Sequence, residues 1–396
     1  MKKQLLHTPE GVRDIYNEEC EKKLLLQSDL LGILKGYGYH PIQTPTFEFF
    51  DIFGKEIGTT PSKELYKFFD REGNTLVLRP DMTPSIARAA AKYFMDEDMP
   101  IRLCYMGNTF INNSSYQGRL KESTQLGAEL IGDSTVDADA EILSMTVECL
   151  QKAGLKDFQL SVGHADFFQG LVEAAGIREE DEEELRELLA NKNFFGVEEF
   201  AETLNLKAEL NELFHMLGSL NVDLNDLKRA KELAASYPRI LAAIHNLEEL
   251  HKVLEVYGID KYVSYELGMV SDYQYYTGII FAGYTFGSGE PIVKGGRYDR
   301  LLTYYGKTSA SIGFAIVIDQ LMAALSRQKI NISIETNGEL IVYTKANQAK
   351  AILSAKEKRA AGTPVETILK DDTKTNEDYQ NYAKRHRIRT VTFMED

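Results

Sequence analysis

Polar side chains that could hold a small charged ligand first occur in the segment LRPDMT, residues 78–83. Asp81 and Thr83 lie two residues apart, so an extended backbone would place both on one side. There a carboxylate and a hydroxyl could accept hydrogen bonds from an ammonium group and balance its charge. A turn or a helix cap is the commoner role of an Asp-x-Thr sequence, so both interpretations stay open.

A second polar pair lies in QLGAELIG, residues 125–132. Gln125 and Glu129 are four residues apart and face the same side of a strand, whereas Leu126 and Leu130 face the other side. Gly127 would leave room for a ligand to approach the backbone. The pattern predicts either a polar cavity or a solvent-facing sheet surface, and this segment alone does not separate the two.

Aromatic and glycine-rich segments follow later in the chain. Tyr273, Tyr275 and Tyr276 in DYQYYTG could add a phenol and a ring wall to a site, although tyrosines on strands more often pack in a core or at a sheet edge. GSGEPIVKGGRYD, residues 287–299, has the spacing of neither a P-loop nor a dinucleotide-binding fingerprint. We therefore interpret it as a hairpin turn followed by a close-packed strand.

Composition excludes several classes of protein. The seven histidines form no triad or metal spacing, and Cys20, Cys104 and Cys149 are far apart, so we expect no hydrolase, metal site or disulfide. Sixty acidic and 45 basic residues give a net charge of -15 without a local basic cluster, which argues against a nucleic-acid-binding surface. The absence of a signal-peptide pattern and of apolar runs of about 18 residues predicts a cytoplasmic protein that does not span a membrane.

These segments need strands and helices to position them. Hydrophobic periodicity predicts a helix over 17–35 with Leu24, Leu25, Leu31 and Leu34 on or near one face. In chain order it then predicts a strand-like stretch over 39–53, a strand, loop and helix over 76–94 with Pro84 in the first helical turn, a hairpin over 102–132 and a helix over 137–154.

The middle of the chain has a different character. Residues 166–258 are helix-rich and charged, which predicts a helical insertion, and the six consecutive acids at 179–184 predict a solvated helix face without a ligand. Strand signals return over 261–286, and 311–325 is helix-like. After about residue 331 the tail predicts a small βαβαβ unit.

Several segments, taken in order, resemble the catalytic core of class II histidyl-tRNA synthetases over about residues 5–325. They are TPEGVRDI, TPTFE, LRPDMT, QGRLKESTQLGAELIG, YYTG, GGRYDRL and SIGFAIVIDQL. The resemblance implies an α+β fold with a six- or seven-stranded antiparallel sheet flanked by helices, dimerising through the segment around Pro45. It implies a synthetase-like core over 1–165 and 259–328, a helical insertion over 166–258, and a shortened anticodon-binding-like domain over 329–396.

Departures from the synthetase pattern fall on the groups that handle ATP. Ile111 and Asn113 stand where the resemblance expects the arginine and glutamate of the motif-two loop. Ser271 and Gln320 stand where it expects two further arginines. Because losing one preorganised donor of transition-state charge costs about 3 to 4 kcal/mol, losing three should abolish adenylate synthesis.

Positions that match the synthetase's histidine contacts are retained, except that Asp81 stands where the resemblance expects a glutamate. They hold Asp81, Thr83, Gln125, Glu129, Tyr275 and Tyr276. The resemblance implies that Asp81 and Thr83 take the α-amino group with help from Gln125, and that Glu129 and a tyrosine hold the imidazole edge. Arg119 is the expected carboxylate partner. Retained amino-acid ligands beside missing ATP ligands indicate binding without catalysis.

This combination resembles the regulatory subunits of ATP phosphoribosyltransferase, which are catalytically inactive paralogues of histidyl-tRNA synthetase. The resemblance implies no cofactor, no tRNA, and assembly as a dimer with a short-form catalytic subunit in a hetero-octamer that histidine inhibits. Three alternatives remain: an active histidyl-tRNA synthetase, a stand-alone histidine-binding or aminoacyl-ligase paralogue, and an architectural subunit with an empty pocket.

Overall fold

The structure is a computed structural model that describes residues 6–54, 60–113, 120–270 and 275–395. The chain divides into two compact units. One comprises Met1–Asp14 and Leu26–Asn331, and the other Ile15–Leu25 and Ile332–Asp396. In the described part of the chain, no helix is both long enough and apolar enough to cross a membrane.

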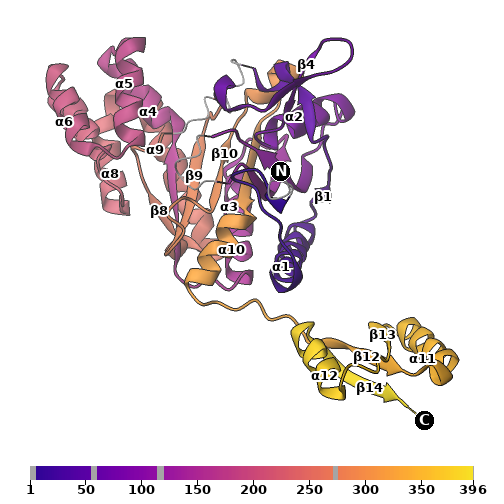
Figure 1. The fold of residues 1–396 in the computed structure, drawn as a ribbon. Coiled ribbons are helices and arrows are strands. Elements are labelled where there is room, and N and C mark those ends of the chain that lie inside the picture. Colours follow the sequence, from indigo (N-terminus) through magenta and orange to yellow (C-terminus); the bar gives the residue numbers. More distant parts are fainter. Residues whose placement is uncertain (1–5, 55–59, 114–119, 271–274, 396) are drawn as a thin grey trace. The chain divides into compact units, whose positions relative to one another are not determined.

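An eight-stranded sheet forms the centre of the first unit, in the order β1-β5-β6-β11-β10-β9-β7-β8 (Figure 1). The strands are β1 (His40–Pro41), β5 (Ile101–Phe110), β6 (Glu122–Ile131), β7 (Phe158–His164), β8 (Val263–Tyr265), β9 (Ile279–Thr285), β10 (Val293–Arg297) and β11 (Ser311–Val317). The six central strands pair antiparallel, as the resemblance implies. The edge strands β1 and β8 are additional and pair parallel, so the sheet is mixed rather than wholly antiparallel.

The predicted hairpin is confirmed as β5 and β6, which pair from Ile101 with Ile131 to Phe110 with Glu122. The period-two alternation of β6 buries Leu126, Ala128 and Leu130 completely. Helix α3 (Val136–Lys152) packs against β6 and β11, and helix α10 (Ile318–Arg327) follows β11. The helix-like reading of 311–325 was wrong for its first half, because that apolar run is a strand buried within the sheet.

Helix α1 (Asn17–Gly36) confirms the first predicted helix, and of the four leucines predicted on or near one face only Leu34 is buried. Leu26, Leu30 and Leu34 are buried, whereas Leu24 and Leu25 are exposed. The buried residues follow the i, i+4, i+8 spacing of a single helical face, and the run of three leucines at 24–26 concealed which of them belongs to it.

A small antiparallel sheet lies beside the main sheet, in the order β2-β4-β3. Its strands are β2 (Phe47–Phe49), β3 (Lys67–Phe69) and β4 (Thr75–Leu78). A loop from β4 leads into helix α2 (Thr83–Tyr93), whose first turn contains Pro84 as expected. Asp81 and Thr83 therefore do not share an extended segment: Asp81 is in the loop, and Thr83 begins the helix.

Six helices gather at the β8 end of the main sheet (Figure 1). They are α4 (Ala165–Ala175), α5 (Glu179–Ala190), α6 (Phe194–Thr203), α7 (Ala208–Met216), α8 (Leu224–Leu233) and α9 (Pro238–Tyr257). The acidic run begins α5, which buries only Leu185 and Leu189, in keeping with a solvated face.

The C-terminal tail confirms the predicted βαβαβ order. Its elements are β12 (Asn337–Tyr343), α11 (Gln348–Ala360), β13 (Val365–Leu369), α12 (Asn376–Arg385) and β14 (Ile388–Met394). The strands pair parallel in the order β13-β12-β14. Leu340, Val342 and Tyr379 are buried in one core cluster of this sheet.

A buried ion pair fixes the start of α3 to β10. Arg297 donates from Nη2 to Asp139 Oδ1 at 2.5 Å, and its Nη1 reaches the Asp133 carbonyl at 2.9 Å. Removing the carboxylate would leave the buried guanidinium paired through the longer 3.4 Å contact between its Nη1 and Asp299 Oδ1, so we expect Asp139→Ala to lower the free energy of unfolding by about 3 kcal/mol. Urea denaturation would measure this. Asp137→Ala, an exposed carboxylate in the same helical turn, is the control and should change stability by less than about 1 kcal/mol.

Candidate functional site

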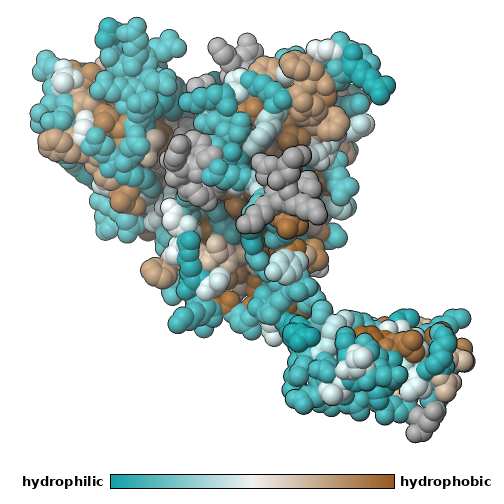
Figure 2. Space-filling model, viewed as in Figure 1, coloured by the Kyte–Doolittle hydropathy of each residue, from teal (hydrophilic) through white to brown (hydrophobic). Residues whose placement is uncertain are grey.

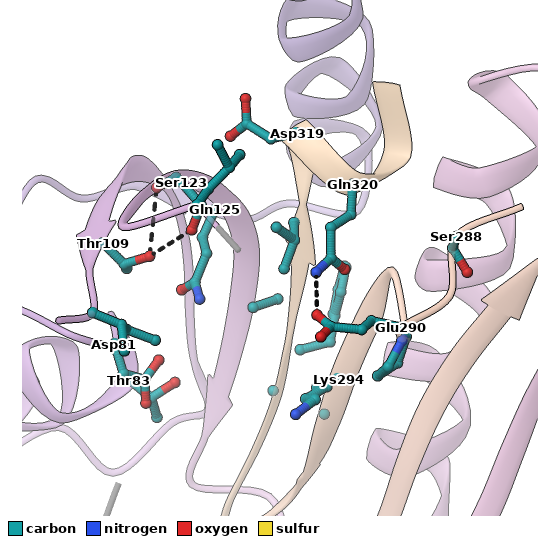
Figure 3. Close-up of a pocket in the computed structure, with 18 of the residues that line it drawn as sticks. Asp81, Thr83, Thr109, Ser123, Gln125, Ser288, Glu290, Lys294, Asp319 and Gln320 are labelled. Atoms are coloured by element: carbon teal, nitrogen blue, oxygen red, sulfur yellow. Dashed lines mark hydrogen bonds between the residues drawn. The ribbon is translucent and has the colours of Figure 1, made fainter. Parts of the chain in front are cut away.

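A cleft of about 740 Å³ opens on the main sheet (Figure 3). Its floor comes from β6, β10 and β11, and its walls come from the start of α2, the 288–291 turn and α10. In Figure 3, Asp81, Thr83, Thr109, Ser123 and Gln125 lie on one side, and Ser288, Glu290, Lys294 and Gln320 lie on the other. The cleft is large enough for an amino acid or a larger metabolite.

Six of the seven predicted ligand residues line this one cleft. They are Asp81, Thr83, Gln125, Glu129, Tyr275 and Tyr276. The seventh, Arg119, lies outside the described residues. The structure thus brings together side chains from three distant parts of the sequence.

Glu129 is the most enclosed acid of the cleft, with 1% of its surface exposed. Thr83 Oγ1 donates to its Oε1 at 2.8 Å, and the Tyr298 hydroxyl donates to its Oε2 at 2.5 Å. Burial raises the pKa of Glu129 from 4.5 to about 8, although the two hydroxyls favour the ionised form. The segment around Glu129 is therefore a polar cavity and not a solvent-facing sheet surface.

A glycine opposite Glu129 makes room for its carboxylate. Gly313 pairs with Glu129 across β11 and β6, and a Cβ at this position would lie 1.7 Å from Oε2. Any side chain there would displace the carboxylate, so the glycine keeps this end of the cleft open.

Asp81 presents one carboxylate oxygen to the cleft. Its Oδ1 accepts a hydrogen bond from the Met82 amide at 2.7 Å, whereas Oδ2 is buried without a hydrogen-bond partner among the described residues. Burial raises the pKa of Asp81 to about 6, against the lowering effect of the Met82 and Thr83 amides. A carboxylate oxygen in this state is a ready acceptor for a cationic donor.

Other unsatisfied acceptors face the same cleft. Within the described ranges, Asn113 Oδ1, Gln125 Oε1 and Gln320 Oε1 are also buried without a partner, and all three residues line the cleft. Buried acceptors are ordinarily paired, so their concentration in one cavity indicates a ligand rich in N–H donors.

Gly127 has a different role from the expected one. A Cβ on Gly127 would lie 2.1 Å from the Phe314 carbonyl oxygen and 2.5 Å from the Tyr105 hydroxyl. Tyr105 from the neighbouring strand β5 therefore fills the space above Gly127, and the glycine makes room for this tyrosine and not for a ligand.

Tyr275 and Tyr276 combine the two roles left open by the sequence. Tyr275 is buried and packs edge-on against Tyr298, with ring centroids 5.9 Å apart, while its ring lies 4.9 Å from that of Tyr276. Both residues also line the cleft. The two tyrosines therefore pack in the core and also form part of the cleft wall.

The residues that replace the expected ATP ligands lie in the same cleft. Ile111, Asn113 and Gln320 all line it, and Gln320 Nε2 donates to Glu290 Oε2 at 2.9 Å. Ser271 lies outside the described residues. These positions of the cleft therefore hold an aliphatic side chain and an amide bonded to a carboxylate, where the synthetase resemblance expects cations.

Several polar residues that line the cleft were not predicted from the sequence. Among them are Tyr298, Lys294, Glu290 and Asp319. Lys294 and Tyr298 belong to VKGGRYD, which the sequence predicts as a close-packed strand and which overlaps GGRYDRL, one of the segments that resemble the synthetases. The alternation of β10, with Lys294 exposed between buried Val293 and Gly295, was the available signal.

Comparisons with known proteins identify the family to which this chain belongs. A family model described as histidyl-tRNA synthetase matches residues 11–321. A relative from Acetivibrio thermocellus named ATP phosphoribosyltransferase regulatory subunit is 39% identical, over 92% of this chain and 87% of its own length. The chain belongs to the ATP phosphoribosyltransferase regulatory subunit family. A second relative of that name, from Ruminiclostridium cellulolyticum, is 37% identical over 100% of this chain and 94% of its own.

Solved structures agree with membership of the regulatory subunit family. A crystal structure of an ATP phosphoribosyltransferase regulatory subunit/histidyl-tRNA synthetase from Bacillus halodurans matches with a TM-score of 0.86 and 31% identity, covering 98% of each chain. Histidyl-tRNA synthetase from Nostoc matches with a TM-score of 0.79 at 19% identity, over 97% of this chain and 90% of its own, which shows the shared fold alone. The resemblance found in the sequence is confirmed.

Proposed function

We propose that this protein is the non-catalytic regulatory subunit of an ATP phosphoribosyltransferase, that it assembles with a short-form catalytic subunit, and that bound L-histidine signals through it. One observation carries the proposal. The same cleft that gathers unsatisfied acceptors around Asp81 and Gln125 has Ile111 and Gln320 where a synthetase would hold ATP. Such a cleft suits the binding of an amino acid without its activation.

In the proposed complex, histidine would lie at the inner end of the cleft with its ammonium toward Asp81 and its imidazole toward Glu129. Its α-ammonium would donate to Asp81 Oδ2 and Gln125 Oε1, both of which lack partners among the described residues. Its imidazole N–H would donate to Glu129, whose carboxylate has more acceptor sites than the two hydroxyls use. Tyr275 and Tyr276 would wall the ring, and Thr83 would hold Glu129 in place. Arg119 is the carboxylate partner proposed from the sequence, because Ser271 replaces the arginine that the resemblance expects.

Exposed aromatic side chains support self-association. Phe47, Phe49, Phe68 and Phe69 on β2 and β3 are each at least 36% exposed. Figure 2 shows hydrophobic surface over this small sheet. Apolar patches of this kind mark interaction surfaces, and the patch adjoins Pro45, through which dimerisation was expected. Dimers of this subunit would then assemble with the catalytic subunit into a hetero-octamer.

Co-assembly tests the proposed function directly. The full chain would be mixed with a short-form ATP phosphoribosyltransferase catalytic subunit, and complex formation followed by size-exclusion chromatography. We expect a stable complex with raised transferase activity that falls when histidine is added. No complex and no change in activity would favour a stand-alone histidine-binding protein. A complex without a histidine response would favour an architectural subunit.

The raised pKa values predict a pH dependence of histidine binding. In the free protein Glu129, with a pKa of about 8, is mostly protonated at pH 7, and Asp81, with a pKa of about 6, is mostly ionised. In the proposed pose the imidazole N–H joins the two hydroxyls as a donor to Glu129 and so favours its ionised form. Above about pH 7 the imidazole of histidine is itself mostly neutral, so we expect binding at pH 7 to release a proton from Glu129 and affinity to increase between pH 7 and 8. Calorimetry in two buffers of different ionisation enthalpy measures the release. Equal heats in both buffers would contradict it.

An active histidyl-tRNA synthetase remains the second candidate. It is favoured by the family model over residues 11–321 and by a solved structure named histidine–tRNA ligase subunit from Alicyclobacillus acidocaldarius. That structure is 28% identical with a TM-score of 0.70, over 82% of this chain and 98% of its own. An adenylate assay separates the two candidates.

A further inference from the structure

The cleft is strongly acidic, yet an amino acid brings a carboxylate with it. Five acids line the described part of the cleft: Glu64, Asp81, Glu129, Glu290 and Asp319. Two basic residues oppose them, Lys294 and Arg327. A zwitterion needs at least one cationic group beside its carboxylate, because a carboxylate held among other carboxylates is repelled.

Arg327 is poorly placed for that task. It lies in the last turn of α10, and its Nη1 donates to the carbonyl of Gly287. Lys294 instead lies in the middle of β10, where its neighbours Val293 and Gly295 are buried. Figure 3 shows its side chain in the cleft, facing the side that carries Asp81 and Thr83.

Strand register sets the position of Lys294 relative to the inner end of the cleft. Lys294 pairs with Ala315, which pairs with Gly127, so these three residues form one row across β10, β11 and β6. On β6, Gly127 lies between Gln125 and Glu129. Because neighbouring strands are about 4.8 Å apart, the backbone of Lys294 on β10 lies about 10 Å from that of Gly127 on β6. Ala315 is too small to block the space between.

Lys294 also acts electrostatically on the inner end. Its positive charge is among the influences that lower the pKa of Asp81 against the larger effect of burial. The lysine and the proposed ammonium site are thus close enough to interact electrostatically.

We infer that Lys294 binds the α-carboxylate of histidine and so selects the amino acid over amines that share its imidazole and ammonium groups. This inference rests on the proposed binding of histidine and names its carboxylate partner within the described residues, in place of Arg119. The flexible ammonium of Lys294 pairs with the carboxylate, while Asp81 and Gln125 hold the α-ammonium. Both charges of the zwitterion are then neutralised inside an otherwise acidic cleft.

The test compares two ligands that differ at the carboxylate. Binding of L-histidine and of L-histidinol, which carries a CH2OH group instead, would be measured by calorimetry with the full chain. We expect Lys294→Met to weaken histidine binding by about 10- to 100-fold, because one charge-assisted contact is lost. Histidinol binding should stay the same or become tighter, since a positive charge near its ammonium is removed. Lys294→Arg keeps the charge and should retain most of the histidine affinity.

Matched variants make the outcome decisive. Arg327→Met removes the other cation of the described lining and should leave the ratio of histidine to histidinol affinity unchanged; thermal melts would confirm that each variant is folded. The assignment would be overturned if Lys294→Met weakened the binding of both ligands equally or of neither. It would also be overturned if only Arg119→Met weakened histidine binding without weakening histidinol binding. If the unmodified protein binds neither ligand, the proposed histidine site fails with it, which differs from a failure of Lys294 alone.

Discussion

Glu129→Gln is expected to weaken histidine binding by about 10- to 150-fold. The substitution removes the charge that the imidazole N–H would meet, and hydrogen bonds to charged groups contribute about 1.5 to 3 kcal/mol. It also replaces an acceptor with an NH2 donor facing either the Thr83 or the Tyr298 hydroxyl, both of which now donate to Glu129. That mismatch is present with and without ligand, so it lowers the free energy of unfolding by about 1 to 3 kcal/mol and not the affinity. The lost contact with the imidazole alone corresponds to about 10- to 150-fold in affinity.

Calorimetry with histidine measures this effect, and a second carboxylate of the same strand provides the control. Glu122 also lies on β6 and accepts a hydrogen bond from Asn108 Nδ2 at 2.7 Å, but it does not line the cleft. Glu122→Gln should therefore leave histidine affinity within about twofold of the original, a free-energy change below about 0.5 kcal/mol. A similar loss in both variants would show that hairpin stability, and not ligand contact, determines binding.

The sequence was most informative where a local rule decides the outcome. Period-two alternation alone places Gln125 and Glu129 on one face of β6, and the structure keeps them there. Pro84 marks the first turn of α2 because a proline is tolerated only there within a helix. The tail, with its regular alternation of strand and helix, was also predictable as a small parallel sheet.

Features fixed by pairing across the sheet could not be predicted in the same way. β1 and β8 have two and three residues, too few to show a period, so the parallel edges were missed. The role of Gly313 depends on its pairing with Glu129 across the sheet, and the position of Lys294 in the cleft depends on its pairing with Ala315. The apolar run of β11 has no period because the sheet buries it, and such a run is compatible with a helix until its neighbours are known.

The purified protein is expected to catalyse no histidine-dependent exchange of pyrophosphate into ATP. Ile111 and Gln320 line the cleft where the synthetase resemblance places cationic donors, and Gln320 already donates to Glu290. Each missing donor costs about two to three powers of ten in rate, so losing two lowers the rate by about 10,000-fold or more. Glu290, Asp319 and Glu64 add negative charge that repels a triphosphate. The assay is labelled-pyrophosphate exchange at saturating histidine, with an active histidyl-tRNA synthetase as the positive control.

Variants that restore the cations test whether the missing positive charge alone prevents adenylate synthesis. Ile111→Arg alone should leave exchange at background, because Gln320 and the cleft carboxylates are unchanged. Ile111→Arg with Gln320→Arg adds both charges, and the second also breaks the contact with Glu290. Tighter ATP binding by this double variant without exchange would mean that charge was lost together with the geometry needed to align the phosphates, since binding and alignment contribute separately to the rate. Histidine-dependent exchange by the unmodified protein would instead identify a working synthetase and remove the proposed regulatory role.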